Sequence, residues 1–129
     1  MDRLLVTTSA REQMVNITGP TQSLVTQRGW RDGILTLFCP HTSASILLCE
    51  GHDPNVGIDF LRSMTRLVPG EHLYRHEGNP DAHIKASLTG HSLQIFIENG
   101  QLQLGSWQGV FFCDFDGPRP REVWLKYKG

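Results

Sequence analysis

The sequence contains no apolar run of about twenty residues, the length that a membrane-spanning helix needs. It also lacks a basic stripe and any run of like charges, and its net charge at pH 7 is −1. Residues 1–6 do not form the long apolar core of a signal peptide. We therefore expect a cytoplasmic protein that binds neither membranes nor nucleic acid, since nucleic-acid binding depends on clustered positive charge.

Cysteine is scarce, and its placement argues against a disulfide framework. Cys39, Cys49 and Cys113 are odd in number, lie far apart and form no C-x-x-C pair. This pattern predicts free thiols in a reducing compartment. The sequence also has no G-x-S-x-G, no G-x-x-x-x-G-K-[ST], and no G-x-G-x-x-G after a predicted strand. A nucleotide-hydrolysing P-loop and a dinucleotide fold are therefore disfavoured.

The composition is that of one globular domain. The chain has 129 residues, of which 39% are hydrophobic, and a chain of this length can bury most of the surface that it exposes when unfolded. We find no internal repeat and no low-complexity linker. We therefore predict a single domain over residues 1–129.

Short apolar stretches bounded by glycine and proline predict about eight strands. Residues 92–98 alternate between apolar and polar, and Asn99-Gly100 after them is a strong signal for a two-residue hairpin turn. Residues 34–39 and 44–49 are continuous apolar runs, which suggest strands covered on both faces. The predicted strands are residues 4–8, 14–18, 34–39, 44–49, 92–98, 101–105, 110–115 and 122–127.

Two helices are predicted from their end signals. Residues 19–28 begin at a Gly-Pro pair and end before a glycine, and a second helix begins at Asp53-Pro54 and continues to about residue 68. Residues 82–88 favour a third, short helix over a loop. Together these elements predict an α+β fold: one compact, β-rich domain of mostly antiparallel strands. Its layers are either two sheets in a sandwich-like arrangement or one sheet covered by two or three helices.

Residues 74–90 concentrate chemically active side chains on a turn-rich segment. His76, Asp81, His83 and Lys85 occupy ten positions that also contain glycine and proline. Two imidazoles, a carboxylate and an ammonium are poor material for an apolar core, because unpaired buried charge is costly. The segment therefore predicts a small metal or phosphate site.

His41, His76 and His83 are the candidate metal ligands. Three histidines with an open position form a common catalytic metal site, which leads us to predict a divalent ion such as zinc, manganese or magnesium. The alternative is that each histidine only satisfies a turn or packs at an edge, since no short spacing such as H-E-x-x-H joins them. The other three histidines are expected to be solvated or capping residues: His52, His72 and His91.

Further candidates for chemistry lie outside the histidines. Asp53 and Asp81 are candidate acids, bases or partners that orient an imidazole, although Asp53 is explained equally well as a helix N-cap. Asp59 is expected to be solvated on its helix. Lys85 and Arg75 are candidate anion-binding residues, and the alternative for Lys85 is an exposed position on a short helix.

Glycines on both sides of Ser106, Trp107 and Gln108 permit a close backbone approach. The amide of Gln108 is suited to hydrogen-bond a ligand. Trp107 is expected either to line a pocket or to pack in a core or interface.

Several segments together match the pattern of a known family. They are residues 41–45, 53–56, 74–76, 80–88, 99–100, 105–110 and Asp114. On these segments the chain resembles the YjbQ-like family, whose members are labelled secondary thiamine-phosphate synthases. Ser106 departs from the family's usual threonine, and Gly51-His52 falls in a segment that usually carries asparagines.

The resemblance implies a β-rich α+β homotrimer, with a polar site near the subunit boundary and a metal ion held by histidines, which correspond to His41, His76 and His83. The residues that we accordingly predict as catalytic are Asp53, Asp81, Lys85 and Gln108. Those predicted to contact substrate are Thr42, Ser43, Arg75, Lys85 and Trp107.

Two functional hypotheses follow. The first is a metal-dependent enzyme that acts on a small phosphorylated or anionic substrate; in the family's labelled reaction, a pyrimidine diphosphate is joined to a thiazole phosphate with release of pyrophosphate. The second is a non-catalytic trimeric protein that binds a small anionic ligand or a metal. A purely structural trimer would leave the charged segment 76–85 without a reason.

Overall fold

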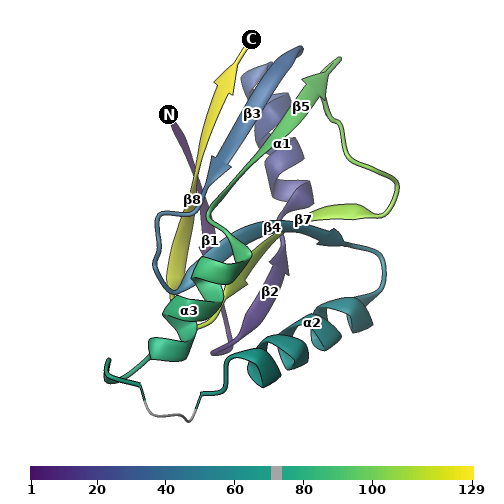
Figure 1. Cartoon of the computed structure of the whole chain (residues 1–129). Coiled ribbons are helices and arrows are strands. Elements are labelled where there is room, and N and C mark those ends of the chain that lie inside the picture. The colour runs from purple at the N-terminus through teal and green to yellow at the C-terminus, as the bar shows by residue number, and fades with distance from the viewer. Residues whose placement is uncertain (71–73) are drawn as a thin grey trace.

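Two antiparallel sheets share one hydrophobic core in the computed structural model, which describes residues 1–70 and 74–129 (Figure 1). The larger sheet has the order β1 (Asp2–Thr7), β8 (Pro120–Lys128), β3 (Gly33–Phe38), β5 (Ser92–Glu98) and β6 (Gln101–Leu102). The smaller has the order β2 (Gln13–Asn16), β7 (Gln108–Asp114) and β4 (Ala44–Glu50). The helices are α1 (Thr18–Arg28), α2 (Pro54–Leu67) and α3 (Pro80–Thr89). The α+β prediction with two layers of sheet is thus confirmed.

The shared core comes from the inner face of each sheet. Leu35 and Leu37 of β3 and Phe112 of β7 are fully buried, and Val25 of α1 joins the same cluster. The predicted hairpin is present: Asn99 and Gly100 both have positive φ and connect β5 to β6. A positive φ at both central positions is what a type I′ turn requires. β6 is shorter than predicted, since it ends at Leu102 instead of Gly105.

The two continuous apolar runs have different environments. β4 lies in the smaller sheet, which has the shared core on one face and α2 and α3 on the other. The prediction that both faces of β3 are covered is wrong for this chain, because Ile34 is 38% exposed and Phe38 is 42% exposed. These two side chains point to the outer face of the larger sheet, which no other element of the described chain covers.

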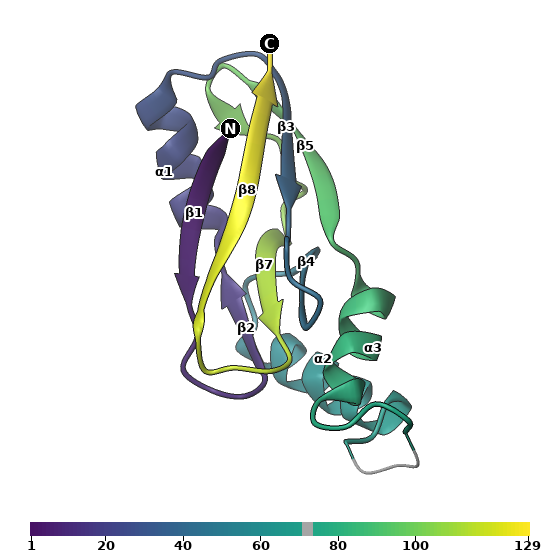
Figure 2. The ribbon, with the colours of Figure 1, turned by 90° about the vertical axis from the view of Figure 1, so that its left-hand side faces the viewer.

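Helices α2 and α3 lie together at one end of the molecule (Figure 2). Asp53 is the N-cap of α2 and accepts a hydrogen bond from the Asn55 N–H at 2.9 Å, with Pro54 in the first turn, as predicted. The third helix is also confirmed, and Ala82 and Ala86 of α3 pack with Cys113 and with partly buried apolar side chains of α2. Within the described residues, no helix is long and apolar enough to cross a membrane.

The three cysteines are free thiols, as predicted. Burial raises the pKa of Cys39 to about 11 and that of Cys113 to about 12. Both thiols are therefore protonated at neutral pH and serve as small apolar side chains of the core.

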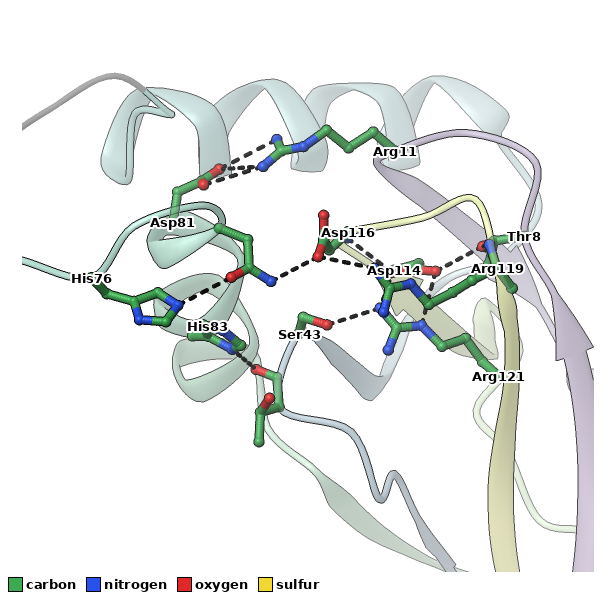
Figure 3. A network of polar contacts seen from close by, with 12 residues as sticks. Thr8, Arg11, Ser43, His76, Asp81, His83, Asp114, Asp116, Arg119 and Arg121 are labelled. Carbon is green, nitrogen blue, oxygen red and sulfur yellow. Dashed lines mark hydrogen bonds and ion pairs between the residues drawn. The ribbon is translucent and has the colours of Figure 1, made fainter. Parts of the chain in front are cut away.

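A buried ion pair joins the two sheets. Arg121 of β8 donates to both carboxylate oxygens of Asp114 at the end of β7, at 2.6 and 3.1 Å, and both side chains are almost fully buried (Figure 3). The Thr8 hydroxyl donates to the same carboxylate at 2.7 Å, and the Arg121 guanidinium also donates to Ser43. Burial opposes ionisation of Asp114, but these donors and the charge of Arg121 outweigh it and hold its pKa below 3.8.

We expect Asp114→Ala to lower the free energy of unfolding by about 3–5 kcal/mol, because Arg121 would stay buried without its counter-charge. Asp2→Ala is the matched control, since Asp2 also pairs with an arginine, Arg28, but the pair is partly exposed. That change should cost less than about 1 kcal/mol. Urea denaturation at pH 7 compares the two variants, and equal losses would contradict a special role for the buried pair.

Candidate functional site

His76 and His83 lie side by side where the start of α3 meets two loops. The loops are residues 41–43, before β4, and residues 115–119, after β7. The two imidazole rings have centroids 5.2 Å apart and are inclined by 66°. His76 is exposed and His83 is half-buried, so the pair is accessible from solvent.

Each ring of this histidine pair has one nitrogen bound to an oxygen acceptor. Nδ1 of His83 lies 3.1 Å from the Thr42 carbonyl oxygen, and Nε2 of His76 lies 3.2 Å from Oδ1 of Asn79. Because these oxygens accept, the hydrogens are on Nδ1 of His83 and Nε2 of His76. In the neutral rings the opposite nitrogens therefore carry lone pairs, which is the form that binds a metal ion.

A chain of side chains fixes the orientation of His76 (Figure 3). Asn79 donates its amide N–H to Asp116 at 2.7 Å, which turns the amide oxygen toward His76. Arg119 donates to the same Asp116 oxygen at 3.2 Å, and the Asp116 backbone N–H donates to Asp114. The histidine pair is thus connected through Asp116 to the buried ion pair between the sheets.

Gly117 allows the turn that carries Asp116 and Arg119. A Cβ atom at this position would overlap the Ala10 carbonyl oxygen and crowd the Thr8 hydroxyl. The close approach of the two backbones requires glycine here.

The third predicted ligand, His41, does not join the pair. Its Nε2 accepts a hydrogen bond from the Glu122 backbone N–H at 3.0 Å, and its ring meets Phe112 edge-on. Burial and the charge of Arg121 lower the pKa of His41, so the ring is neutral at pH 7. Over residues 1–70 and 74–129 no group of three or more His, Cys, Asp or Glu side chains is placed to hold a metal ion. Metal binding stays a prediction, and His72 lies outside the described residues.

Asp81 and Lys85 share one face of α3 because they are four residues apart. His83 is two residues from each of them and therefore lies on a different face. Lys85 is 1% exposed, and its Nζ lies 2.5 Å from Glu12 and 3.3 Å from Asp81. Arg11 also pairs with Asp81, at 3.2 Å. This network attaches α3 to the segment between β1 and β2. Its two carboxylates, Glu12 and Asp81, neutralise the ammonium of Lys85, which was predicted to bind an anion.

Asp53, Trp107 and Gln108 form a separate group at the opposite end of the smaller sheet. In the β4–β7 pairing, Ala44 is opposite Asp114, near the histidine pair, whereas Glu50 is opposite Gln108. Six residues of strand separate the two ends, which corresponds to roughly 20 Å. Within one chain the predicted site residues therefore lie in more than one place.

The residues of this second group have mainly local partners. The Gln108 side chain accepts a hydrogen bond from the Gly105 N–H at 2.8 Å. Trp107 is 68% exposed, so it is not a core residue, and its ring meets that of His52 edge-on with centroids 5.4 Å apart. Asp53 acts as the helix cap.

The remaining predicted substrate contacts lie near the histidine pair. Ser43 is buried and bonded to Arg121, Thr42 contributes its carbonyl to His83, and Arg75 is exposed next to His76 in the chain. Sequence reasoning missed Asn79, Asp116 and Arg119. The available signals were the Gly-Asn-Pro and Asp-Gly-Pro-Arg segments, in which glycine and proline indicate turns but give no sign that the polar side chains meet.

Comparisons with known proteins give a consistent match over the whole chain. A family model described as UPF0047 protein YjbQ-like matches residues 2–129. UPF0047 protein YugU of Bacillus subtilis is 43% identical over 128 residues, covering 98% of this chain and 97% of YugU. UPF0047 protein MJ1081 of Methanocaldococcus jannaschii is 43% identical over 125 residues, covering 96% and 91%.

Solved structures match equally well. A protein of the yjbq/upf0047 family from Clostridium acetobutylicum is 45% identical with a TM-score of 0.95, covering 99% of this chain and 100% of that one. The conserved hypothetical protein TT1486 from Thermus thermophilus is 41% identical with a TM-score of 0.92, again covering 99% and 100%.

The stability that Asp81 provides should depend on pH. Burial raises the pKa of Asp81, but hydrogen bonds and charge from Arg11 and Lys85 outweigh it and hold the pKa below 3.8. Its contribution is therefore complete above pH 3.8 and is lost as the pH falls through the lowered pKa.

We expect Asp81→Asn to lower the free energy of unfolding by about 2 kcal/mol at pH 7, and by much less at acidic pH. Asp59→Asn, an exposed position on α2, is the control and should change little at any pH. Urea denaturation between about pH 2 and pH 7 measures both variants. Parallel pH curves for the wild type and Asp81→Asn would contradict the assignment.

Proposed function

The chain belongs to the UPF0047 (YjbQ-like) family, and we propose that its His76–His83 pair binds a divalent metal ion and a small anionic or phosphorylated substrate. The observation that carries the proposal is the geometry of the pair. The rings are 5.2 Å apart, and each has one nitrogen bonded to an oxygen while the other is left with a lone pair. Oxygen partners of this kind orient histidines in metal sites.

The donor set fits zinc or manganese better than magnesium, since imidazole suits the first two and magnesium prefers oxygen. Two histidines leave the remaining coordination positions to water or substrate. His41 would become a third ligand only by giving up the bond that its Nε2 accepts from Glu122, because Nδ1 carries the hydrogen of the neutral ring while Nε2 accepts. A divalent ion here would supply positive charge to a bound phosphate.

The side chains around the pair suit an anion. Arg119 is half-exposed next to Asp116, and Arg75 is exposed beside His76. Guanidinium groups bind phosphate oxygens in a bidentate fashion. Asn79 and the Thr42 carbonyl would hold the two rings in position while these arginines bind and orient the substrate.

Among phosphorylated substrates we propose the pair named by the family resemblance, a pyrimidine diphosphate and a thiazole phosphate, which are joined with release of pyrophosphate. A leaving pyrophosphate gains negative charge, and the positive groups of this cluster are suited to stabilise it. Asp81, Lys85, Asp53 and Gln108 remain predicted catalytic residues, but this step does not require them.

One observation favours the alternative of a non-catalytic binding protein. Asp81, Asp114 and Asp116 each form an ion pair with an arginine. A general base needs a carboxylate that no cation neutralises, and these three aspartates do not meet that condition. In this alternative the same cluster holds a small anion or a metal without turnover.

We also propose that the protein is a cytoplasmic homotrimer. The outer face of the larger sheet supports assembly, because Leu5, Phe38 and Phe96 are 78%, 42% and 64% exposed. Apolar side chains spread over one uncovered sheet face are typical of an interface. The free thiols support a reducing compartment.

We expect His83→Ala to lose bound metal while it keeps its fold. Protein purified without an affinity tag should contain about one divalent ion per chain by elemental mass spectrometry, and the variant close to none. His91→Ala is the control, because His91 is half-buried away from the pair. Full metal content in His83→Ala would show that the site is assigned wrongly.

An activity assay of the wild type, His83→Ala and His91→Ala distinguishes an enzyme from a non-catalytic binding protein. Pyrophosphate release from the pyrimidine diphosphate and the thiazole phosphate should occur with the wild type and His91→Ala, and fall at least about a hundredfold with His83→Ala. Tight binding without turnover in the wild type would instead support the binding protein.

We expect the wild type to have three times the 14.5 kDa mass of one chain by light scattering. Phe96→Glu should reduce that mass, because a carboxylate would be buried in an apolar interface. Gln27→Glu adds the same charge at an exposed position of α1, which packs on the core side of the sheets, and should leave the trimer intact. A monomeric wild type would contradict the proposed homotrimer.

A further inference from the structure

A second candidate site lies away from the histidine pair, in a pocket of about 390 Å³ between α2 and the smaller sheet. Met14 of β2, Phe111 of β7, and Ile58 and Leu61 of α2 form its apolar walls. Neither His76 nor His83 lines it. The volume is within the range of small-molecule sites, which are mostly apolar with a few polar groups. We call it the α2 pocket.

Three of the polar side chains that line the α2 pocket are carboxylates. Its described lining includes Glu12, Glu50 and Asp53, and neither lysine nor arginine. Lys85 lies behind Glu12, 2.5 Å from its carboxylate, and neutralises that charge. The charges of Glu50 and Asp53 have no such cation among the described residues.

Backbone hydrogen bonds hold these two carboxylates in place. Glu50 accepts from the His52 and Asp53 N–H groups at 2.8 and 2.9 Å, and Asp53 accepts from the Asn55 N–H with one oxygen only. Each carboxylate oxygen can accept two hydrogen bonds, so both groups keep acceptor capacity. The N-terminus of α2 offsets about half a charge, which leaves the pocket negative.

The walls favour a flat ligand. The Met14 thioether and the Phe111 ring both make favourable contacts with aromatic groups. An apolar pocket with two fixed carboxylates that lack a cationic side-chain partner among the described residues complements a small aromatic cation whose N–H groups can donate to them. We propose that the α2 pocket binds a small aromatic cation, independently of the histidine pair.

Benzamidine and benzamide are the matched probes, because they have nearly the same shape and only benzamidine is charged at pH 7. The methyl signal of Met14 in the native protein reports binding by NMR, and Met1 serves as the internal control. We expect a saturable Met14 shift with benzamidine and at least about tenfold weaker binding of benzamide. Equal affinities, or no shift with benzamidine at millimolar concentration, would overturn the proposal.

Variants of the pocket test the charge directly. Asp53→Asn keeps a good N-cap and removes one charge, so benzamidine should bind about three- to tenfold more weakly. Ile58 is 46% exposed, so a longer polar side chain can be placed there. Ile58→Lys brings an ammonium to the pocket and should abolish benzamidine binding. Ile58→Gln is the uncharged control and should retain most of the binding. Equal losses in the two Ile58 variants would count against a cation site. His83→Ala should bind benzamidine normally, which separates this test from that of the metal site.

Discussion

The buried pair of Arg121 and Asp114 is the interaction on which the rest of the arrangement depends. It joins β8 of the larger sheet to β7 of the smaller one and receives further donors from Thr8 and the Asp116 backbone. A buried charge pair is tolerated only when its hydrogen-bonding groups are satisfied, and this one meets that condition. Because Asp114 begins the turn that carries Asp116, the pair also sets the position of Asn79 and thereby of His76.

Helix α3 combines two roles because its faces have different partners. Asp81 and Lys85 point to Arg11 and Glu12 and attach the helix by ion pairs, while His83 points to the Thr42 carbonyl. In the sequence these side chains form one charged segment, and we treated them as one site. The helical period of 3.6 residues separates them into a structural network and an accessible pair.

Much of the fold could be predicted because its signals are local. The Asp53-Pro54 cap, the Asn99-Gly100 turn and the apolar alternation of β5 each depend on neighbouring residues. The prediction for β3 failed within the chain because an apolar run has the same pattern whether or not another element of the same chain covers its outer face. The pairing of His76 with His83 was anticipated from their shared segment, whereas the relay through Asp116 joins residues 37 positions apart.

The sequence by itself determined the elements and the presence of a reactive segment, since short-range sterics, capping and hydrophobic period fix these. Only the tertiary structure decided which side chains meet. It placed the 105–109 segment at the far end of the smaller sheet from the histidines, engaged His41 with Glu122, and created the α2 pocket. The physical reason is that strand pairing and helix packing bring together residues far apart in the chain, and no local preference encodes which strand ends coincide.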